Sequence, residues 1–150
     1  MMNGAFKIET INDTDRIKQV LTMFNTSFLP SLNERVGRLQ DYALKLANNA
    51  VFNIISFEDK IIGFAAYYCN DMLVKHSFLT QFAIDDNFKG QRIGSILLEF
   101  CIENLKQRGI KKLVCEVDET NFAALKFYEA HDFVFFRKSD RNSYFLCKYL

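Results

Sequence analysis

Residues 82–98 read FAIDDNFKGQRIGSILL, a segment that passes from an apolar strand through a polar turn into an amphipathic helix. Gly90 lies in the turn, and Gly94 follows at the start of the predicted helix. A helix that begins at a glycine-containing turn presents unpaired backbone N–H groups and the positive end of its dipole. Lys89 and Arg92 add positive charge beside them. The segment predicts an anion site suited to a diphosphate. The alternative is a surface turn whose glycines only reverse the chain.

Apolar periodicity on both sides of this segment predicts the remaining elements. Strands are expected at 6–11, 51–57, 61–69, 76–84, 112–117, 133–137 and 143–149. Helices are expected from the capping residues 12–15 to Phe28, along a stripe from Val36 to Leu46 that ends at 48–49, from Ile93 to a cap at Gly109, and at 121–130. The order β-α-α-β-β-β-α-β-α-β-β predicts a single domain over residues 1–150 of the α/β class, an α+β mixed sheet with helices on both faces.

Composition excludes several classes of function. The formal net charge of +1 argues against a general nucleic-acid binder. No apolar stretch approaches the length of a membrane span, and the first residues show no secretory signal, so we expect a cytoplasmic protein. The four cysteines form no C-x-x-C pair, which favours buried free thiols over disulfides. No residue cluster has the spacing of metal ligands, and neither a P-loop nor a dinucleotide fingerprint occurs.

Two motifs carry a resemblance to a known family. The run from Lys89 to Gly94 resembles the Q/R-x-x-G-x-G/A signature of the GNAT superfamily of acyl-CoA-dependent N-acetyltransferases. Downstream, the chain resembles that family's strand–helix–strand element at Glu116-Val117, Asn121, Ala124, Phe127-Tyr128 and Phe133. The order of elements matches as well. The resemblance therefore covers nearly the whole chain and implies a GNAT-like fold with a splayed central sheet.

The resemblance also implies roles for individual residues, with acetyl-CoA as the co-substrate. Phe82, Ala83 and Ile84 match the strand whose backbone pairs with the pantetheine arm. The pyrophosphate loop corresponds to Lys89, Gly90, Gln91, Arg92, Ile93, Gly94 and Ser95. Asn121 matches an asparagine that contacts the cofactor arm. Tyr128 matches the general acid, and Glu116 falls where the ribosomal-protein-type branch of the family places a general base.

Three positions depart from the family's pattern. Arg92 stands where the central glycine of the signature is expected. Lys89 replaces a glutamine or arginine at its first position, so bidentate phosphate contact is lost. Asp132 replaces the glycine before Phe133, and aspartate tolerates the left-handed conformation better than most residues. These departures keep a second reading open, in which the chain binds acyl-CoA as a sensor without transferring the acyl group.

Each catalytic candidate has a structural alternative. Glu116 interrupts the apolar run 113–117, where a carboxylate is costly unless it is hydrogen-bonded or faces a cleft. It would act as a base directly or through water, and the alternative is a solvent-facing side chain. Tyr128 would protonate the leaving thiolate, and the alternative is a tyrosine packed in the core.

The sequence says least about the acceptor. The region 24–38, Tyr67, Tyr68 and Asn70-Asp71 are candidates for its walls, His76 is a weaker one, and simple packing is the alternative. We expect a primary amine, by preference a small metabolite such as an amino sugar, with a protein or peptide N-terminus as the alternative. A homodimer is a further expectation, because the apolar last strand, Tyr144–Leu150, could pair between subunits if it lay at the sheet edge.

Overall fold

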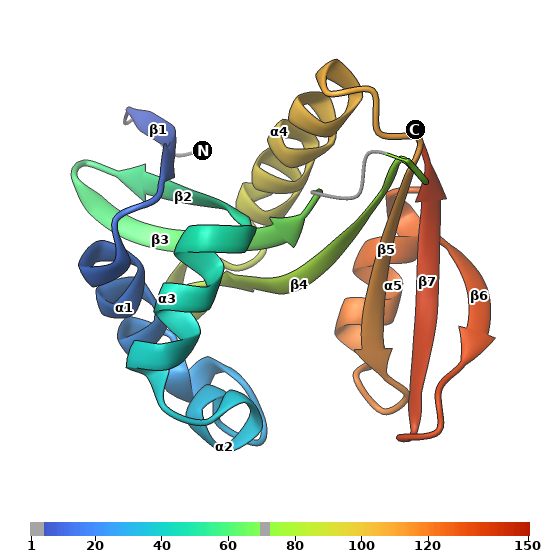
Figure 1. Cartoon of the computed structure of the whole chain (residues 1–150), viewed down its shortest axis with the longest axis horizontal. Coiled ribbons are helices and arrows are strands. Elements are labelled where there is room, and N and C mark those ends of the chain that lie inside the picture. The colour runs from blue at the N-terminus through green and yellow to red at the C-terminus, as the bar shows by residue number, and fades with distance from the viewer. Residues whose placement is uncertain (1–4, 70–72) are drawn as a thin grey trace.

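Seven strands form one mixed sheet in the part of the chain that the computed structural model describes, residues 5–69 and 73–150 (Figure 1). The order across the sheet is β1-β2-β3-β4-β5-β7-β6. Neighbouring strands are antiparallel except β4 and β5, which are parallel. The strands are β1 (Phe6–Ile11), β2 (Val51–Phe57), β3 (Lys60–Tyr68), β4 (His76–Ile84), β5 (Lys112–Asp118), β6 (Val134–Lys138) and β7 (Ser143–Tyr149). The predicted mixed sheet is confirmed.

Helices cover both faces of this sheet (Figure 1). They are α1 (Thr14–Met23), α2 (Leu32–Val36), α3 (Leu39–Asn49), α4 (Ile93–Gln107) and α5 (Phe122–Ala130), with 3₁₀ turns η1 (Asn25–Ser27) and η2 (Asp86–Phe88). Buried residues of α1, α2 and α3 form one core with β1–β4, and α4 and α5 form the other with residues of β2, β3, β4, β5 and β7. We call the two sides of the sheet the α1–α3 face and the α4/α5 face. The buried residues of α4 are Ile93, Leu97, Leu98, Cys101, Ile102 and Leu105, whereas Ile96 and Phe100, which the apolar stripe read from the sequence also includes, are exposed.

The central feature of the sheet is a split between β4 and β5. These strands pair only from His76 opposite Lys112 to Leu79 opposite Cys115. Beyond that point β4 stays with β3 as far as Ile84, while β5 stays with β7 as far as its own end. The two strands thus separate while each keeps its other neighbour, so the predicted splayed sheet is confirmed.

A β-bulge lies where the split begins. In the β3–β4 ladder Tyr67 pairs with Leu79 and Ala66 pairs with Gln81, which leaves Thr80 as an extra residue on β4. A bulge bends a strand and shifts its alternation of side chains. Leu79 belongs to the core of the α4/α5 face, and Phe82, three residues later, packs against the same core. In a regular strand, residues three positions apart would point to opposite faces. The bulge therefore turns the last part of β4 away from β5.

Several predicted boundaries are wrong. The first helix ends at Met23 and continues only as η1. The second is two helices, because Gly37 between them has a left-handed φ of 87° that interrupts helical hydrogen bonding. The expectation that the last strand forms a sheet edge is also wrong. β7 lies between β5 and β6, so β1 and β6 are the edges, and β6 rather than β7 presents unpaired backbone.

All four cysteines are free, as the sequence predicts. Cys101, Cys115 and Cys147 are buried, and Cys69 is half-buried. Among the described residues, no helix combines the length and the apolar character needed to cross a membrane.

Candidate active site

One side of the split is the end of β4 that no longer pairs with β5. It consists of Phe82, Ala83 and Ile84, which lie beyond Leu79, the last residue paired with β5, and we call it the free lip of β4. Their backbone groups on the β5 side have no partner strand in the described residues, while the β3 side is fully paired. Such an edge can pair with an extended ligand as a further strand would. All three residues named from the sequence for backbone contact lie on this lip.

The start of α4 adjoins the end of β4. Gly90 has a φ of 80°, and the N-cap residue Arg92 has a φ of 65°. No side chain caps this helix and no acidic residue lies in its first turn. The first backbone bond into it runs from the Ile96 N–H to the Arg92 carbonyl, 3.0 Å. Among the described residues the N–H groups of 90–95 meet no acceptor, so they are available as donors for an anion.

The charged and polar side chains of this loop point mostly to solvent. Gln91 and Arg92 are exposed, and Arg92 forms no ion pair with any described residue. The Lys89 ammonium pairs with the Asp86 carboxylate at 2.8 Å. Ser95 is half-buried at the helix start. The loop therefore offers one unpaired guanidinium beside the row of N–H groups.

Ile93 and Gly94 have structural roles as well. The Ile93 side chain is 1% exposed and anchors the helix start in the core. A Cβ on Gly94 would lie 3.2 Å from Cε1 of Phe127 and 3.7 Å from Cγ1 of Ile84. Glycine therefore lets α4 pack closely against α5 and the end of β4. Any ligand contact from these two residues is through their backbone.

Tyr128, on α5, lies behind the split on the α4/α5 face. Its ring is 7% exposed and packs edge-on against Phe82, Phe127 and Phe133, with centroids 6.5, 5.3 and 5.0 Å away. Burial among these rings raises the pKa of the Tyr128 hydroxyl well above its ordinary value of 10.0, with Cys115 and Cys101 as smaller causes. Among the described residues the Tyr128 hydroxyl has no hydrogen-bond partner. Every fully buried side-chain oxygen in the described residues does have a partner, so the Tyr128 hydroxyl is not completely enclosed.

The two ends of α5 are fixed by residues singled out from the sequence. Asn121 is the N-cap, and its side-chain oxygen accepts a hydrogen bond from the Ala124 N–H at 3.2 Å. Asp132 follows the last turn with a φ of 67°, and the Phe133 N–H then donates to the Tyr128 carbonyl at 3.0 Å. This is the left-handed conformation expected where glycine would stand. It shows that aspartate replaces glycine there without loss of the helix end.

Glu116 lies on the opposite side of the sheet from Tyr128. Its neighbours Cys115 and Val117 point into the core of the α4/α5 face, so Glu116 points to the α1–α3 face. One carboxylate oxygen accepts a hydrogen bond from the Arg141 guanidinium at 2.8 Å, and the other accepts one from the Ser143 hydroxyl. Two charge-assisted hydrogen bonds offset the cost of placing this carboxylate, 21% exposed, in an apolar strand.

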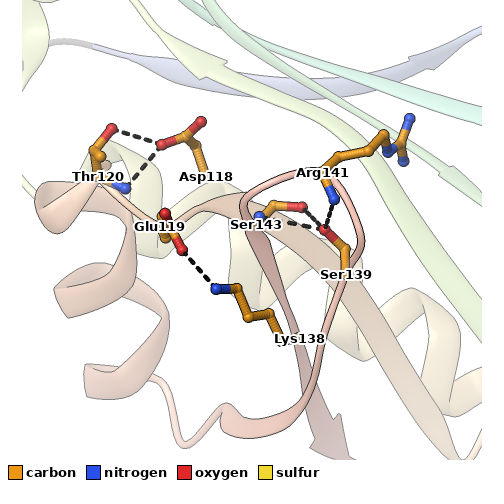
Figure 2. A network of polar contacts seen from close by, with 7 residues as sticks. All are labelled: Asp118, Glu119, Thr120, Lys138, Ser139, Arg141 and Ser143. Atoms are coloured by element: carbon orange, nitrogen blue, oxygen red, sulfur yellow. Dashed lines mark hydrogen bonds and ion pairs between the residues drawn. The ribbon is translucent and has the colours of Figure 1, made fainter.

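Arg141 lies in the loop that joins β6 to β7, and Ser143 is the first residue of β7; several hydrogen bonds hold this loop (Figure 2). The Ser139 hydroxyl oxygen accepts from the backbone N–H groups of Arg141 and Ser143, and Lys138 pairs with Glu119 at 3.4 Å. Thr120 donates to Asp118 from its N–H and its hydroxyl, which lowers the pKa of that carboxyl.

Sequence reasoning missed Arg141 and Ser143 as partners of Glu116, because no motif marks a residue of one hairpin as the partner of a residue on another strand.

A groove of about 420 Å³ lies on the α1–α3 face of β4, β5, β6 and β7. Glu116 does not itself line this groove, but its cross-strand partner Phe145 does, which places Glu116 beside it. The groove is lined by Tyr68, Val74, His76, Ser77, Phe78, Val114, Phe136, Arg137 and Phe145. Two of the residues suggested from the sequence for the acceptor, Tyr68 and His76, therefore lie together here.

Other acceptor candidates are placed elsewhere. Tyr67 as a wall residue is wrong, because it is fully buried and its hydroxyl donates to Asn53 at 2.6 Å. Asn70-Asp71 lie outside the described residues. In the region 24–38, Leu32 is fully buried and Phe28 packs against Phe64. Within the described residues, no group of three or more candidate ligands could hold a metal ion.

Comparisons with known proteins agree with this geometry. A family model described as "Acetyltransferase (GNAT) family" matches residues 17–133. The [ribosomal protein bS18]-alanine N-acetyltransferase of Escherichia coli K12 is 33% identical over 69 residues, which are 46% of this chain and 47% of that enzyme. The matched region thus spans about half the length of the curated relatives.

Solved structures share the fold over nearly the whole chain. The PaiA N-acetyltransferase of Thermoplasma acidophilum, solved in complex with coenzyme A, has a TM-score of 0.78 at 13% identity, covering 97% of this chain and 99% of that one. Ard1 of Thermoplasma volcanium has a TM-score of 0.81 at 19% identity, covering 97% and 98%. At these identities the likeness concerns the fold.

Proposed function

Because the chain belongs to the GNAT family of acetyltransferases, we propose that it transfers an acetyl group from acetyl-CoA to a primary amine. One arrangement carries the proposal. The unpaired lip of β4, the uncapped start of α4 and the Tyr128 ring adjoin one split in the sheet. These features suit a long ligand with a diphosphate at one end and a reactive group at the other.

The residues present fit acetyl-CoA. The diphosphate would be held by the N–H groups of residues 90–95, with Arg92 and Lys89 as nearby charge. The backbone of Phe82, Ala83 and Ile84 would hold the extended arm. Asn121 would contribute through its side-chain amide N–H groups, because the amide oxygen is engaged in capping α5.

Acetyl-CoA supplies a thioester whose carbonyl carbon is attacked by the amine lone pair as the C–S bond breaks, so that the N-acetylated amine and free coenzyme A are the products. Glu116 takes the proton that the amine loses, directly or through water. Tyr128 supplies the proton that the leaving sulfur takes up. Its raised pKa keeps the hydroxyl protonated at neutral pH but makes it a weak acid, so its contribution depends on position. We expect no acyl-enzyme at Cys115, because its thiol is buried and burial raises its pKa, which disfavours the nucleophilic thiolate.

The placement of the two groups suits this division of work. Tyr128 belongs to the α4/α5 face and Glu116 to the α1–α3 face, with the split between β4 and β5 beside both. A thioester in the split would have a proton donor on one side and a proton acceptor on the other. The amine would then approach from the groove beside Glu116.

We propose a small-molecule amine as the acceptor. An amino sugar, the example suggested by the sequence, would need several hydrogen-bond partners, and most of the described groove lining is apolar. A protein N-terminus is the second candidate, because the partial match to an enzyme that acts on an alanine of a ribosomal protein favours it.

The test combines binding with turnover. Purified protein is titrated with coenzyme A, and thiol release from acetyl-CoA is then followed with a panel of small amines and an alanine-initiated peptide. Release that depends on one of these amines supports acetyl transfer. Binding of coenzyme A with no release on any amine favours a sensor, and failure to bind coenzyme A contradicts the proposal altogether.

A further inference from the structure

We propose that the groove beside Glu116 selects a free amino acid with an apolar, preferably aromatic, side chain, and that Arg137 binds its carboxylate. This inference rests on the proposed acetyl transfer and names the acceptor class for it. Three observations support it: Glu116, Phe145 and Arg137 form one row across neighbouring strands, most of the groove lining is apolar, and the charge of the lining is positive.

Three strands place Glu116, Phe145 and Arg137 in one row. Glu116 on β5 pairs with Phe145 on β7, and Phe145 pairs with Arg137 on β6. Cross-strand partners project from the same face of a sheet, so all three side chains point to the α1–α3 face. The Arg137 guanidinium lies over the Phe145 ring, 4.6 Å from its centroid. It is thereby drawn along the row from the edge strand toward Glu116.

The charged side chain that lines the described groove is positive. Arg137 forms no ion pair with any described residue, and no described residue lining the groove is acidic. The Lys112 ammonium lies 4.0 Å from the centroid of the Phe136 ring at the groove's far end. The only charged side chain that lines the described groove is therefore a cation, and an amine with no anionic group would leave it without a partner. A carboxylate on the acceptor would complement Arg137, whose planar fork binds carboxylates in two places.

The remaining lining suits an apolar side chain. Phe78, Val114, Phe136 and Phe145 provide apolar surface, and Tyr68 provides an aromatic ring. The amine and carboxylate of an α-amino acid are a few bonds apart, which matches a base and a guanidinium that flank a single phenylalanine. A peptide N-terminus lacks that carboxylate, and an amino sugar lacks both the carboxylate and the apolar side chain. The row therefore favours a free amino acid over both.

The first test is a pair of acceptors that differ only at the carboxyl group. L-phenylalanine and L-phenylalaninamide share their amine and side chain, and the amide imitates a peptide N-terminus. We expect kcat/KM for the acid to exceed that for the amide by about tenfold, the size expected for a hydrogen bond between charged groups. The amide's amine loses its proton more easily, so chemistry without recognition would give the opposite order. A preference for the amide, for glucosamine or for the alanine-initiated peptide overturns the inference.

The second test changes the protein. Arg137→Gln should reduce the acid-to-amide ratio to one or below, while Lys138→Gln, a change of the same kind at the next residue, should leave the ratio as it is. Lys138 pairs with Glu119 and does not line the groove. An equal loss for both acceptors in Arg137→Gln would mean that this arginine is only structural, and would contradict the inference.

A binding measurement separates this inference from the proposed function. N-acetyl-L-phenylalanine and its amide are titrated calorimetrically into the wild-type protein and Arg137→Gln without coenzyme A. Tighter binding of the acid, lost in Arg137→Gln, supports the groove assignment even if no turnover is found. Coenzyme A binding and turnover of other amines with no binding of the acid would retain the proposed function and reject this acceptor.

Discussion

Phe82 on β4 and Tyr128 on α5 pack edge to face, with ring centroids 6.5 Å apart. The pair joins the free lip of the split to the helix that carries the proposed acid. Phe82 lies on this side of the sheet because the extra residue Thr80 shifts the alternation of β4. The bulge thus determines both where β4 leaves β5 and which ring supports Tyr128.

Tyr128→Phe should lower kcat by about tenfold or more, the range in which a positioned acid contributes. The free energy of unfolding should change little, since the hydroxyl bonds to no described residue and the ring contacts stay. Thiol release and urea unfolding give the two quantities. Tyr149→Phe is the control, because Tyr149 is 70% exposed. Equal kcat in the wild type and Tyr128→Phe would remove this tyrosine from the mechanism.

Glu116→Gln should lower kcat/KM by about a hundredfold, within the range of general base catalysis. Arg141→Gln should have a smaller effect, because it frees one carboxylate oxygen while Ser143 still holds the other. Steady-state rates of the two variants give the comparison. If Arg141→Gln is as harmful as Glu116→Gln, the ion pair matters as a unit and Glu116 is not the base by itself.

Arg92 occupies a left-handed conformation that costs a residue with a side chain about 1 kcal/mol more than glycine. Arg92→Gly and Arg92→Ala both remove the guanidinium, but only glycine removes the strain. The glycine variant should therefore unfold at higher urea than the alanine variant. Both should bind coenzyme A more weakly than the wild type, and by similar factors at low salt. If the two variants are equally stable, the loop does not store this strain.

The thiols should react unequally. Burial raises the pKa of Cys101 and of Cys115 to about 12, and Cys147 is 1% exposed. Cys69 is half-buried, with the Arg108 guanidinium 3.6 Å from its sulfur. In the native protein a disulfide reagent should modify Cys69 first and the other three only on unfolding. Cys69→Ser should abolish the fast phase. A fast phase in that variant would mean that one of the cores opens readily.

Stability should fall at alkaline pH. The folded-state pKa values of Cys101 and Cys115 lie above the ordinary 9.0, so the contribution of each thiol is complete below about pH 9 and is lost as the pH rises toward 12. Tyr128, with its raised pKa, acts in the same direction above about pH 10. Urea unfolding at several pH values gives the slope, and Cys115→Ala should reduce it. A flat profile up to about pH 11 would contradict the burial of these groups.

The strands were largely predictable because their residues alternate or run apolar between clear turns. β1, β2, β4 and β7 have the expected bounds. The break at Gly37 was not predictable, because the apolar stripe from Val36 to Leu46 continues across it. The position of β7 between β5 and β6 was also missed. Strand order depends on contacts between residues far apart in the chain, and apolar content alone does not distinguish an edge strand from an inner one.

The site was predictable where one local segment contains the whole feature. The turn and helix start at 89–95 are contiguous, and Asn121 and Tyr128 belong to one helix. Glu116 was found because a carboxylate interrupts an apolar strand. Its partners, the groove and the row that ends at Arg137 depend on the register of three strands. No spacing within the sequence encodes that register.

The seam between the two halves of the sheet consists of four residue pairs, His76 to Leu79 against Lys112 to Cys115. A ladder this short offers little resistance to twisting, so we expect the angle between the halves to be the softest large-scale motion of the fold. A ligand that bonds along β4 and also contacts Asn121 on α5, the helix bonded to β7 through Lys148 and His131, would connect the two halves and restrain that motion. The stiffness of the catalytic cleft would then come partly from its own substrate.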